Sequence, residues 1–257
     1  MQNRIYEIYH ILEEKGTVSV AELVERLKVS EASIRRDLRQ MEDSDMIRRF
    51  YGGATISETQ IKETSLSVRD LSNKEAKTQI AKFAASLIKE GDIVYIDGGS
   101  TTVNVIDFIT ARNILVVTQA INNLEKLIKK NIRCYIAGGY LKNRTSLIVS
   151  GETIDRIKNL KFNIAFLGAN GVHSISGFTA NEEMEAKLKQ IVIENTIEPY
   201  IIADSSKVNK LTVPNFAQLS QASLVTDALV KDFDYSLIKN TYYLSDKGFI
   251  KYEKRRK

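Results

Sequence analysis

Two groups of side chains in this 257-residue sequence have the chemistry to bind anions. The first is a set of arginines near the amino terminus: Arg35, Arg36 and Arg39 stand close together, and Arg48 and Arg49 follow. A guanidinium group can form two parallel hydrogen bonds with the edge of guanine, and it also pairs with phosphate. The spacing of these arginines therefore indicates a DNA-binding surface.

The second group is the segment Asp97-Gly98-Gly99-Ser100-Thr101-Thr102. Its glycines let the backbone approach an anion, its hydroxyls can donate to it, and a following helix presents its amino terminus. Taken alone, the segment is also typical of a plain tight turn. Similar polar residues follow other apolar runs, at positions 118–119, 138–139, 168–171, 204–207 and 226–227. This recurrence favours a phosphate-binding site.

The sequence predicts that Arg35, Arg36 and Arg39 lie on a helix. Ile34, Leu38 and Met41 fall on one narrow stripe at helical spacing, and the arginines lie on other faces. Ser30 occupies the N-cap position before this helix. A charged helix face is often only a solvated face, but the cap and the apolar stripe here agree with a recognition helix.

The surrounding segments complete a winged helix-turn-helix, which we predict over residues 1–56. A helix over residues 4–14 ends at Gly16, and a capping box at residues 19–22 opens a second helix. The helix-turn-helix motif covers about residues 20–39, and the segment 48–54 is typical of a β-wing laid against the phosphate backbone. The predicted DNA-contacting residues are Ser30, Ser33, Arg35, Arg36, Arg39, Arg48, Arg49 and Tyr51.

The net charge of +5 does not by itself argue for DNA binding. Residues 1–56 carry nine Lys and Arg against ten Asp and Glu, whereas the tail at residues 251–257 carries five against one. DNA binding must therefore depend on where a few arginines are placed. The basic tail either adds nonspecific phosphate affinity or is a solubilising end.

Residues 73–250 read as a second domain, joined by a linker at residues 57–72. Short apolar runs alternate with helical segments, which predicts a Rossmann-like, mainly parallel α/β sheet covered on both faces. The single cysteine, Cys134, lies in an apolar run and is predicted to be a buried thiol, so we expect no metal site. No apolar run is long enough to span a membrane and no signal peptide is evident, which predicts a cytoplasmic protein without a membrane partner.

These residues together resemble the DeoR family of bacterial transcription regulators. The resemblance rests on Ile34-Arg35-Arg36-Asp37-Leu38, on Gly52-Gly53-Ala54, and on the loops beginning at Asp97, Gly138, Gly168 and Asp204. It implies a winged helix joined to a sensor domain similar to sugar-phosphate isomerases. It also implies a homo-oligomer, either a dimer or a tetramer, that represses carbohydrate catabolism genes at a double-stranded DNA operator until a phosphorylated sugar binds.

The resemblance also implies which residues bind the effector: Asp97, Gly99, Ser100, Thr101, Thr102, Thr118, Gly138, Gly139, Lys142, Glu185, Asp204 and Lys207. A sugar-phosphate isomerase fused to a DNA-binding head is the alternative, with Glu185 as base, but Asn170 stands where those enzymes carry a catalytic acid. Glu185 and Lys189 could instead be an ion pair on a solvated helix face. A DNA-binding protein with an inert sensor is the third possibility. We predict no catalytic residues and no cofactor.

Overall fold

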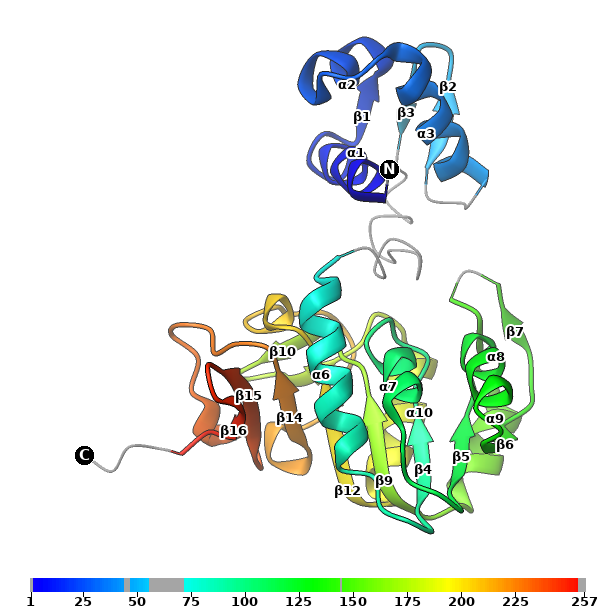
Figure 1. Cartoon of the computed structure of the whole chain (residues 1–257), viewed down its shortest axis with the longest axis vertical. Helices are drawn as coiled ribbons and strands as arrows, with labels where there is room; N and C mark the ends of the chain where they lie inside the picture. Colours follow the sequence, from blue (N-terminus) through cyan, green and yellow to red (C-terminus); the bar gives the residue numbers. More distant parts are fainter. Residues whose placement is uncertain (1, 44–46, 56–71, 144, 254–257) are drawn as a thin grey trace. The chain divides into compact units, whose positions relative to one another are not determined.

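The chain divides into two units, Met1–Ser72 and Asn73–Lys257 (Figure 1). This computed structural model describes residues 2–43, 47–55, 72–143 and 145–253. All but the last residue of the predicted linker at 57–72 lies outside the described residues, as do the last four residues of the predicted basic tail.

In its described part, the first unit contains helices and a small antiparallel sheet. The elements are α1 (Gln2–Lys15), β1 (Thr17–Ser19), α2 (Val20–Leu27), α3 (Glu31–Asp43), β2 (Arg48–Phe50) and β3 (Gly53–Thr55). Gly16 ends α1 with a φ of +71°, and its N–H bonds the carbonyl of Leu12 at 2.7 Å. The Ser19 side chain caps α2 by accepting from the N–H of Glu22 at 3.1 Å.

The apolar stripe of the predicted recognition helix forms part of the core. Ile34, Leu38 and Met41 on α3 are all buried, which confirms the sequence interpretation. Strand β3 lies between β1 and β2 in the sheet, and β2 and β3 form the predicted wing. Gly53 is required there, because a Cβ atom would lie 2.4 Å from the carbonyl oxygen of Val18.

The second unit is built on an eight-stranded sheet in the order β16-β15-β14-β12-β9-β4-β5-β6. Only β16 pairs antiparallel within it, so the predicted mainly parallel sheet is confirmed. The strands of this sheet are β4 (Ile93–Ile96), β5 (Leu115–Thr118), β6 (Arg133–Ile136), β9 (Phe162–Leu167), β12 (Thr196–Ile202), β14 (Ser223–Thr226), β15 (Thr241–Ser245) and β16 (Gly248–Lys251).

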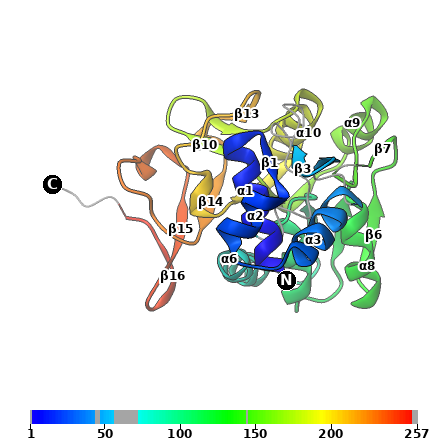
Figure 2. The ribbon, with the colours of Figure 1, turned by 90° about the horizontal axis from the view of Figure 1, so that it is seen from above.

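Helices cover both faces of this sheet. On one side lie α6 (Lys74–Ser86), α7 (Thr102–Phe108) and α8 (Ile121–Lys129), and on the other α9 (Gly151–Lys158) and α10 (Glu183–Glu194) (Figures 1 and 2). Two separate apolar clusters fill the spaces between the helices and the sheet. Shorter elements complete the unit: β7 (Leu141–Lys142), β8 (Leu147–Ile148), β10 (Gly171–His173), β11 (Gly177–Thr179), β13 (Asn215–Ala217), and the 3-10 turns Ser205–Lys207, Leu219–Gln221 and Tyr235–Leu237.

The prediction that Cys134 is a buried thiol was wrong. Cys134 lies on β6, the edge strand of the large sheet, and it is exposed. An edge strand has a neighbour on one side only, and here three of its four residues are exposed. An apolar run therefore identified a strand correctly without identifying its burial.

Candidate functional site

The arginines of α3 and the wing are exposed, but they differ in their partners. Arg35 pairs with Glu31 one turn earlier, at 2.6 Å. Among the residues that the structure describes, Arg36, Arg39 and Arg48 have no ion-pair partner. These three cations are the ones most available to a nucleic acid.

Arg49 fastens the wing to the recognition helix. Its side chain donates to Glu42 at 2.6 Å, and its backbone N–H donates to the same carboxylate at 3.1 Å. The Arg49 hydrogen bonds lower the pKa of Glu42. Tyr51, at the tip of the wing, is fully exposed, as a residue facing a DNA backbone would be.

The start of the recognition helix is ordered by two serines. The hydroxyl of Ser30 accepts from the N–H of Ser33 at 3.3 Å, and the two hydroxyls lie 3.0 Å apart. The sequence interpretation missed Asp37, which is fully buried on α3 and pairs with Arg4 of α1 at 2.5 Å. This pair joins the recognition helix to the first helix of the unit.

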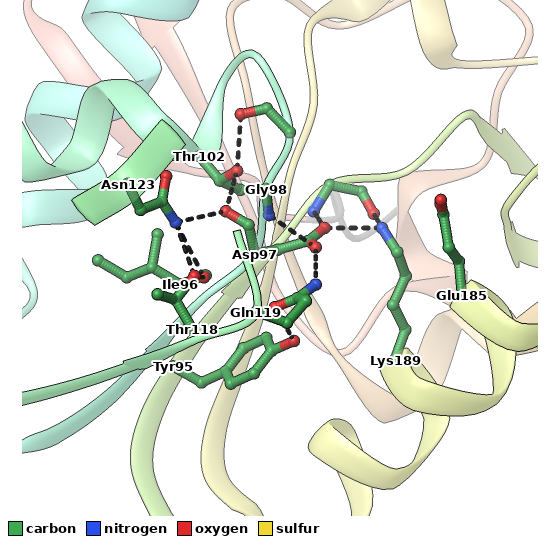
Figure 3. A network of polar contacts seen from close by, with 12 residues as sticks. Tyr95, Ile96, Asp97, Gly98, Thr102, Thr118, Gln119, Asn123, Glu185 and Lys189 are labelled. Atoms are coloured by element: carbon green, nitrogen blue, oxygen red, sulfur yellow. Dashed lines mark hydrogen bonds and ion pairs between the residues drawn. The ribbon is translucent and has the colours of Figure 1, made fainter. Parts of the chain in front are cut away.

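Asp97 is the centre of a polar network at the carboxyl end of β4 (Figure 3). One carboxylate oxygen accepts from the N–H of Gly98 at 2.8 Å and from the side chain of Gln119 at 2.9 Å. The other accepts from Lys189 at 2.7 Å and from the N–H of Gly168 at 3.1 Å. The side chain joins the ends of three neighbouring strands to α10.

Lys189 is buried together with Asp97, not exposed on α10. Its ammonium group also donates to the carbonyl of Gly168 at 2.7 Å and lies over the ring of Phe216. Burial opposes ionisation of the Asp97 carboxyl. The charge of Lys189 and the hydrogen bonds outweigh burial, so the pKa of Asp97 lies below its ordinary value. The alternative of an ion pair between Glu185 and Lys189 on a solvated face was therefore wrong.

Thr118 is likewise committed to the fold. Its hydroxyl donates to the carbonyl of Ile96 at 2.7 Å and accepts from the side chain of Asn123 at 2.8 Å. It is fully buried. Thr102 is also fully buried, and its hydroxyl donates to the carbonyls of Asp97 and Gly99. The side chains of Asp97, Thr102 and Thr118 thus all bond within the loop and the adjacent strands, and their effector-binding role stays a prediction.

Ser100 and Thr101 are the loop side chains that keep unused hydrogen-bonding capacity. Among the described residues, neither hydroxyl has a hydrogen-bond partner, although Ser100 and Thr101 are both buried, with 8% and 7% of their surface exposed. The loop packs closely beneath them, because a Cβ atom at Gly98 would lie 2.0 Å from the side chain of Leu147 on β8. Two donors are thus held at a fixed place at the end of the sheet.

Lys142 and Glu185 bring opposite charges to the same region. Lys142, on β7, pairs with Glu182 and lies 3.4 Å from Glu185 on α10. Burial raises the pKa of Glu185, and the charges of Lys189 and Lys142 only partly offset this effect. Strands β7 and β8 form an antiparallel hairpin, and Gly139 lies just before it. Glycine is required there, because φ is +146° and a Cβ atom would lie 2.4 Å from the hydroxyl of Ser150.

Asp204 and Lys207 lie in a second polar cluster, at the end of β12. Asp204 is buried, and Lys207 follows it in a 3-10 turn. The sequence interpretation missed Lys77 on α6, which is also buried and whose charge acts on Asp204. In the sheet only β9 lies between β12 and β4, and the three strands are parallel. This cluster and the Asp97 network therefore both lie at the carboxyl ends of the strands.

The burial of Lys77 and of Lys189 has a sequence signal. Lys77 stands three, four and seven residues before Ile80, Ala81 and Ala84, and Lys189 stands three before Val192. Each lysine thus occupies the apolar face of its helix, where a charge must be paired. Among the described residues, no group of three or more His, Cys, Asp or Glu side chains could hold a metal ion.

Comparison with known families gives a match to each unit. The model of the DeoR-like helix-turn-helix domain matches residues 4–60, and that of the DeoR C-terminal sensor domain matches residues 72–228. The second match covers more than half of the chain.

Individual relatives are similar over most of their length. The transcriptional regulator FruR of Bacillus subtilis is 37% identical over 226 residues, which cover 87% of this chain and 90% of FruR. The lactose phosphotransferase system repressor of Streptococcus mutans is 31% identical, covering 93% of this chain and 97% of the repressor. Among solved structures, ribose 5-phosphate isomerase A of Methanocaldococcus jannaschii is 20% identical with a TM-score of 0.39, over 55% of this chain and 57% of the isomerase.

Proposed function

Because this chain belongs to the DeoR family, we propose that it represses carbohydrate catabolism genes and leaves its operator when a phosphorylated sugar binds. Residues 1–56 bind double-stranded DNA and residues 73–250 sense the sugar phosphate. The protein acts in the cytoplasm as a homo-oligomer. In the described part of the chain, no helix is both long and apolar enough to cross a membrane.

The observation that carries the DNA-binding part is the exposure of Arg36, Arg39 and Arg48 around a buried apolar stripe. In a helix-turn-helix protein the second helix of the motif enters the major groove, which here is α3. The wing then lies beside the groove, where Arg48 and Tyr51 contact the phosphate backbone. Arg49 holds the wing in position through Glu42.

Two hydroxyls and a lysine support the sensing part. Ser100 and Thr101 offer donors at the carboxyl end of a parallel strand, the place where open α/β sheets bind ligands. Lys142 lies at the same edge of the sheet and supplies a positive charge. We propose that the phosphate group binds these three residues and that Glu185 binds sugar hydroxyls.

A screen of sugar phosphates against the full chain, read by thermal shift, tests this function. A ligand at about 100 times its dissociation constant stabilises the folded state by about 2.7 kcal/mol, which raises the melting temperature of a unit of this size by about 5 to 10 °C. The same ligand should release a bound operator duplex. A response to no sugar phosphate supports the inert sensor, and conversion of one to a product supports the isomerase.

Thr101→Glu should abolish the thermal shift, because a carboxylate beside the phosphate site repels the ligand. Thr101→Val removes only the hydroxyl and should weaken the response while keeping the fold. Thr110→Glu adds the same charge at an exposed position outside the loop and serves as the control. A full response in Thr101→Glu would contradict the assignment.

Arg48→Ala should weaken binding to all duplexes similarly and lower the slope of log affinity against log salt by about one, because one phosphate contact is lost. Arg26→Ala is the control, because Arg26 is an exposed arginine of the same unit that lies on α2, outside the wing. Its loss should change the slope less. Equal changes in the two titrations would contradict a phosphate contact by Arg48.

A further inference from the structure

The first residue of the second unit makes an unusual contact. Asn73 lies at the N-cap of α6 with φ 50° and ψ 38°, a left-handed conformation. An asparagine at this position usually caps its own helix, but Asn73 makes no such hydrogen bond. Its side-chain amide donates instead to Asp204, at 2.9 Å, across 131 residues of sequence.

Asp204 is well suited to report on a bound anion. The oxygen that accepts from Asn73 also accepts from the N–H of Ser206 at 3.1 Å and from the Ser206 hydroxyl. The charges of Lys207 and Lys77 both act on this buried carboxylate. A ligand whose phosphate binds at the end of β4 and whose sugar extends towards the end of β12, two strands away, would therefore change the electrostatic surroundings of Asp204.

Asn73 also stands where the second unit meets the chain that leads to the DNA-binding unit. Its neighbour Ser72 is the last residue of the first unit. The carbonyl of Asn73 itself accepts from the N–H of Lys77 in the first turn of α6, at 3.0 Å. One hydrogen bond thus links Asp204 to the residue at which the chain leaves the second unit towards the DNA-binding unit.

We propose that the hydrogen bond between Asn73 and Asp204 couples occupation of the effector site to operator binding. This inference rests on the proposed function, because it assumes that a sugar phosphate occupies the carboxyl edge of the sheet. Asn73 is a positioning residue and does not contact the ligand. Coupling between two sites is reciprocal, so operator binding changes ligand affinity by the same factor.

The first experiment needs no ligand. Asn73→Gly keeps the left-handed backbone, which glycine adopts freely, and removes the side-chain hydrogen bond. Amide exchange in the first turn of α6, including the N–H of Lys77, should become about 2- to 10-fold faster, as expected for the loss of one hydrogen bond. Asn113→Gly is the matched control, since Asn113 has a φ of 58° but lies outside this cluster. Unchanged exchange in Asn73→Gly would overturn the inference.

The second experiment measures the coupling itself. Operator affinity of the full chain is titrated with and without the probe that gives the largest thermal shift among fructose 1-phosphate, fructose 6-phosphate, glucose 6-phosphate and ribose 5-phosphate. In the wild-type chain we expect the probe to change affinity by about 5- to 150-fold, the usual range of allosteric coupling. In Asn73→Gly the probe should hardly change operator affinity, whereas operator binding itself and the thermal shift should both be retained.

The two failures are distinguishable. A wild-type chain that responds to none of the four probes contradicts the proposed function and the coupling with it, whereas amide exchange still reports whether the contact anchors α6. A wild-type response that persists at full size in Asn73→Gly contradicts the coupling alone. A response lost in Asn113→Gly as well would show that any strained turn disturbs the unit, which also overturns a specific role for Asn73.

Discussion

Lys189→Met should destabilise the second unit by about 3 to 5 kcal/mol, the cost of leaving a buried charge without its partner. The partner is Asp97, whose side chain is almost completely buried and 2.7 Å from the ammonium group. The methionine fills much of the same volume, so the loss reflects the charge and its hydrogen bonds more than a cavity. Guanidinium unfolding of the full chain, followed by circular dichroism, measures this change.

The control for this substitution lies on the same helix. Lys187→Met removes an exposed lysine whose side chain donates to Gln190 at 3.4 Å, and it should cost less than about 0.5 kcal/mol. Combining Lys189→Met with Asp97→Asn should cost less than the sum of the two single changes, because both remove one interaction. Strict additivity, or equal losses in the Lys187 and Lys189 variants, would refute the role of the pair.

The pH dependence of stability gives an independent check on the same pair. The folded chain holds the pKa of Asp97 below its ordinary value. The pair therefore makes its full contribution to the free energy of unfolding when the pH is above the pKa of this carboxyl in the unfolded chain. The contribution is lost as the pH falls through the folded-state pKa. Lys189→Met lacks the partner that depresses this pKa. The stability difference between wild type and variant should therefore narrow on acidification.

Arg36→Ala should weaken operator binding by about 1 to 3 kcal/mol and relax the sequence preference. Arg36 is exposed on α3 and has no ion-pair partner among the described residues, so its guanidinium is available to a base edge. Fluorescence anisotropy measures two affinities: one for an operator selected from random duplexes, and one for an unrelated duplex of equal length. The ratio between them should fall.

Arg26→Ala separates a base contact from a general loss of charge. Arg26 is an exposed arginine on α2, outside the recognition helix, and its substitution removes the same charge from the same unit. It should lower both affinities slightly and leave their ratio unchanged. An Arg36→Ala chain that keeps the wild-type ratio would remove α3 from the role of recognition helix.

The sequence predicted the elements better than the pairing of their charges. Strand β4 begins and ends where its apolar run does, because a strand buried on both faces has a continuous apolar sequence. The partner of Lys189, in contrast, lies 92 residues away, and no local periodicity encodes such a contact. The predicted i,i+4 partner, Glu185, was nearer in sequence but lies closer to Lys142 in the fold.

For the candidate site, the sequence predicted which strand ends come together but not which side chains stay available there. Glycine and hydroxyl residues at the ends of apolar runs located the carboxyl edge of the sheet, because parallel strands all end there. Which hydroxyls stay available depends on neighbouring carbonyls that come close only in three dimensions. Thr102 and Ser100 are two residues apart, yet only the hydroxyl of Thr102 is hydrogen-bonded to carbonyls of the loop.

The carboxylates that hold Arg35 and Arg49 also act when the protein meets DNA that is not its operator. Each of these arginines must give up a glutamate before it can take a phosphate, so a random duplex offers little net gain. Genomic DNA presents roughly 10⁶ to 10⁹ such competing sites. We expect the glutamates of these two pairs to act as built-in counterions that weaken binding to each such site.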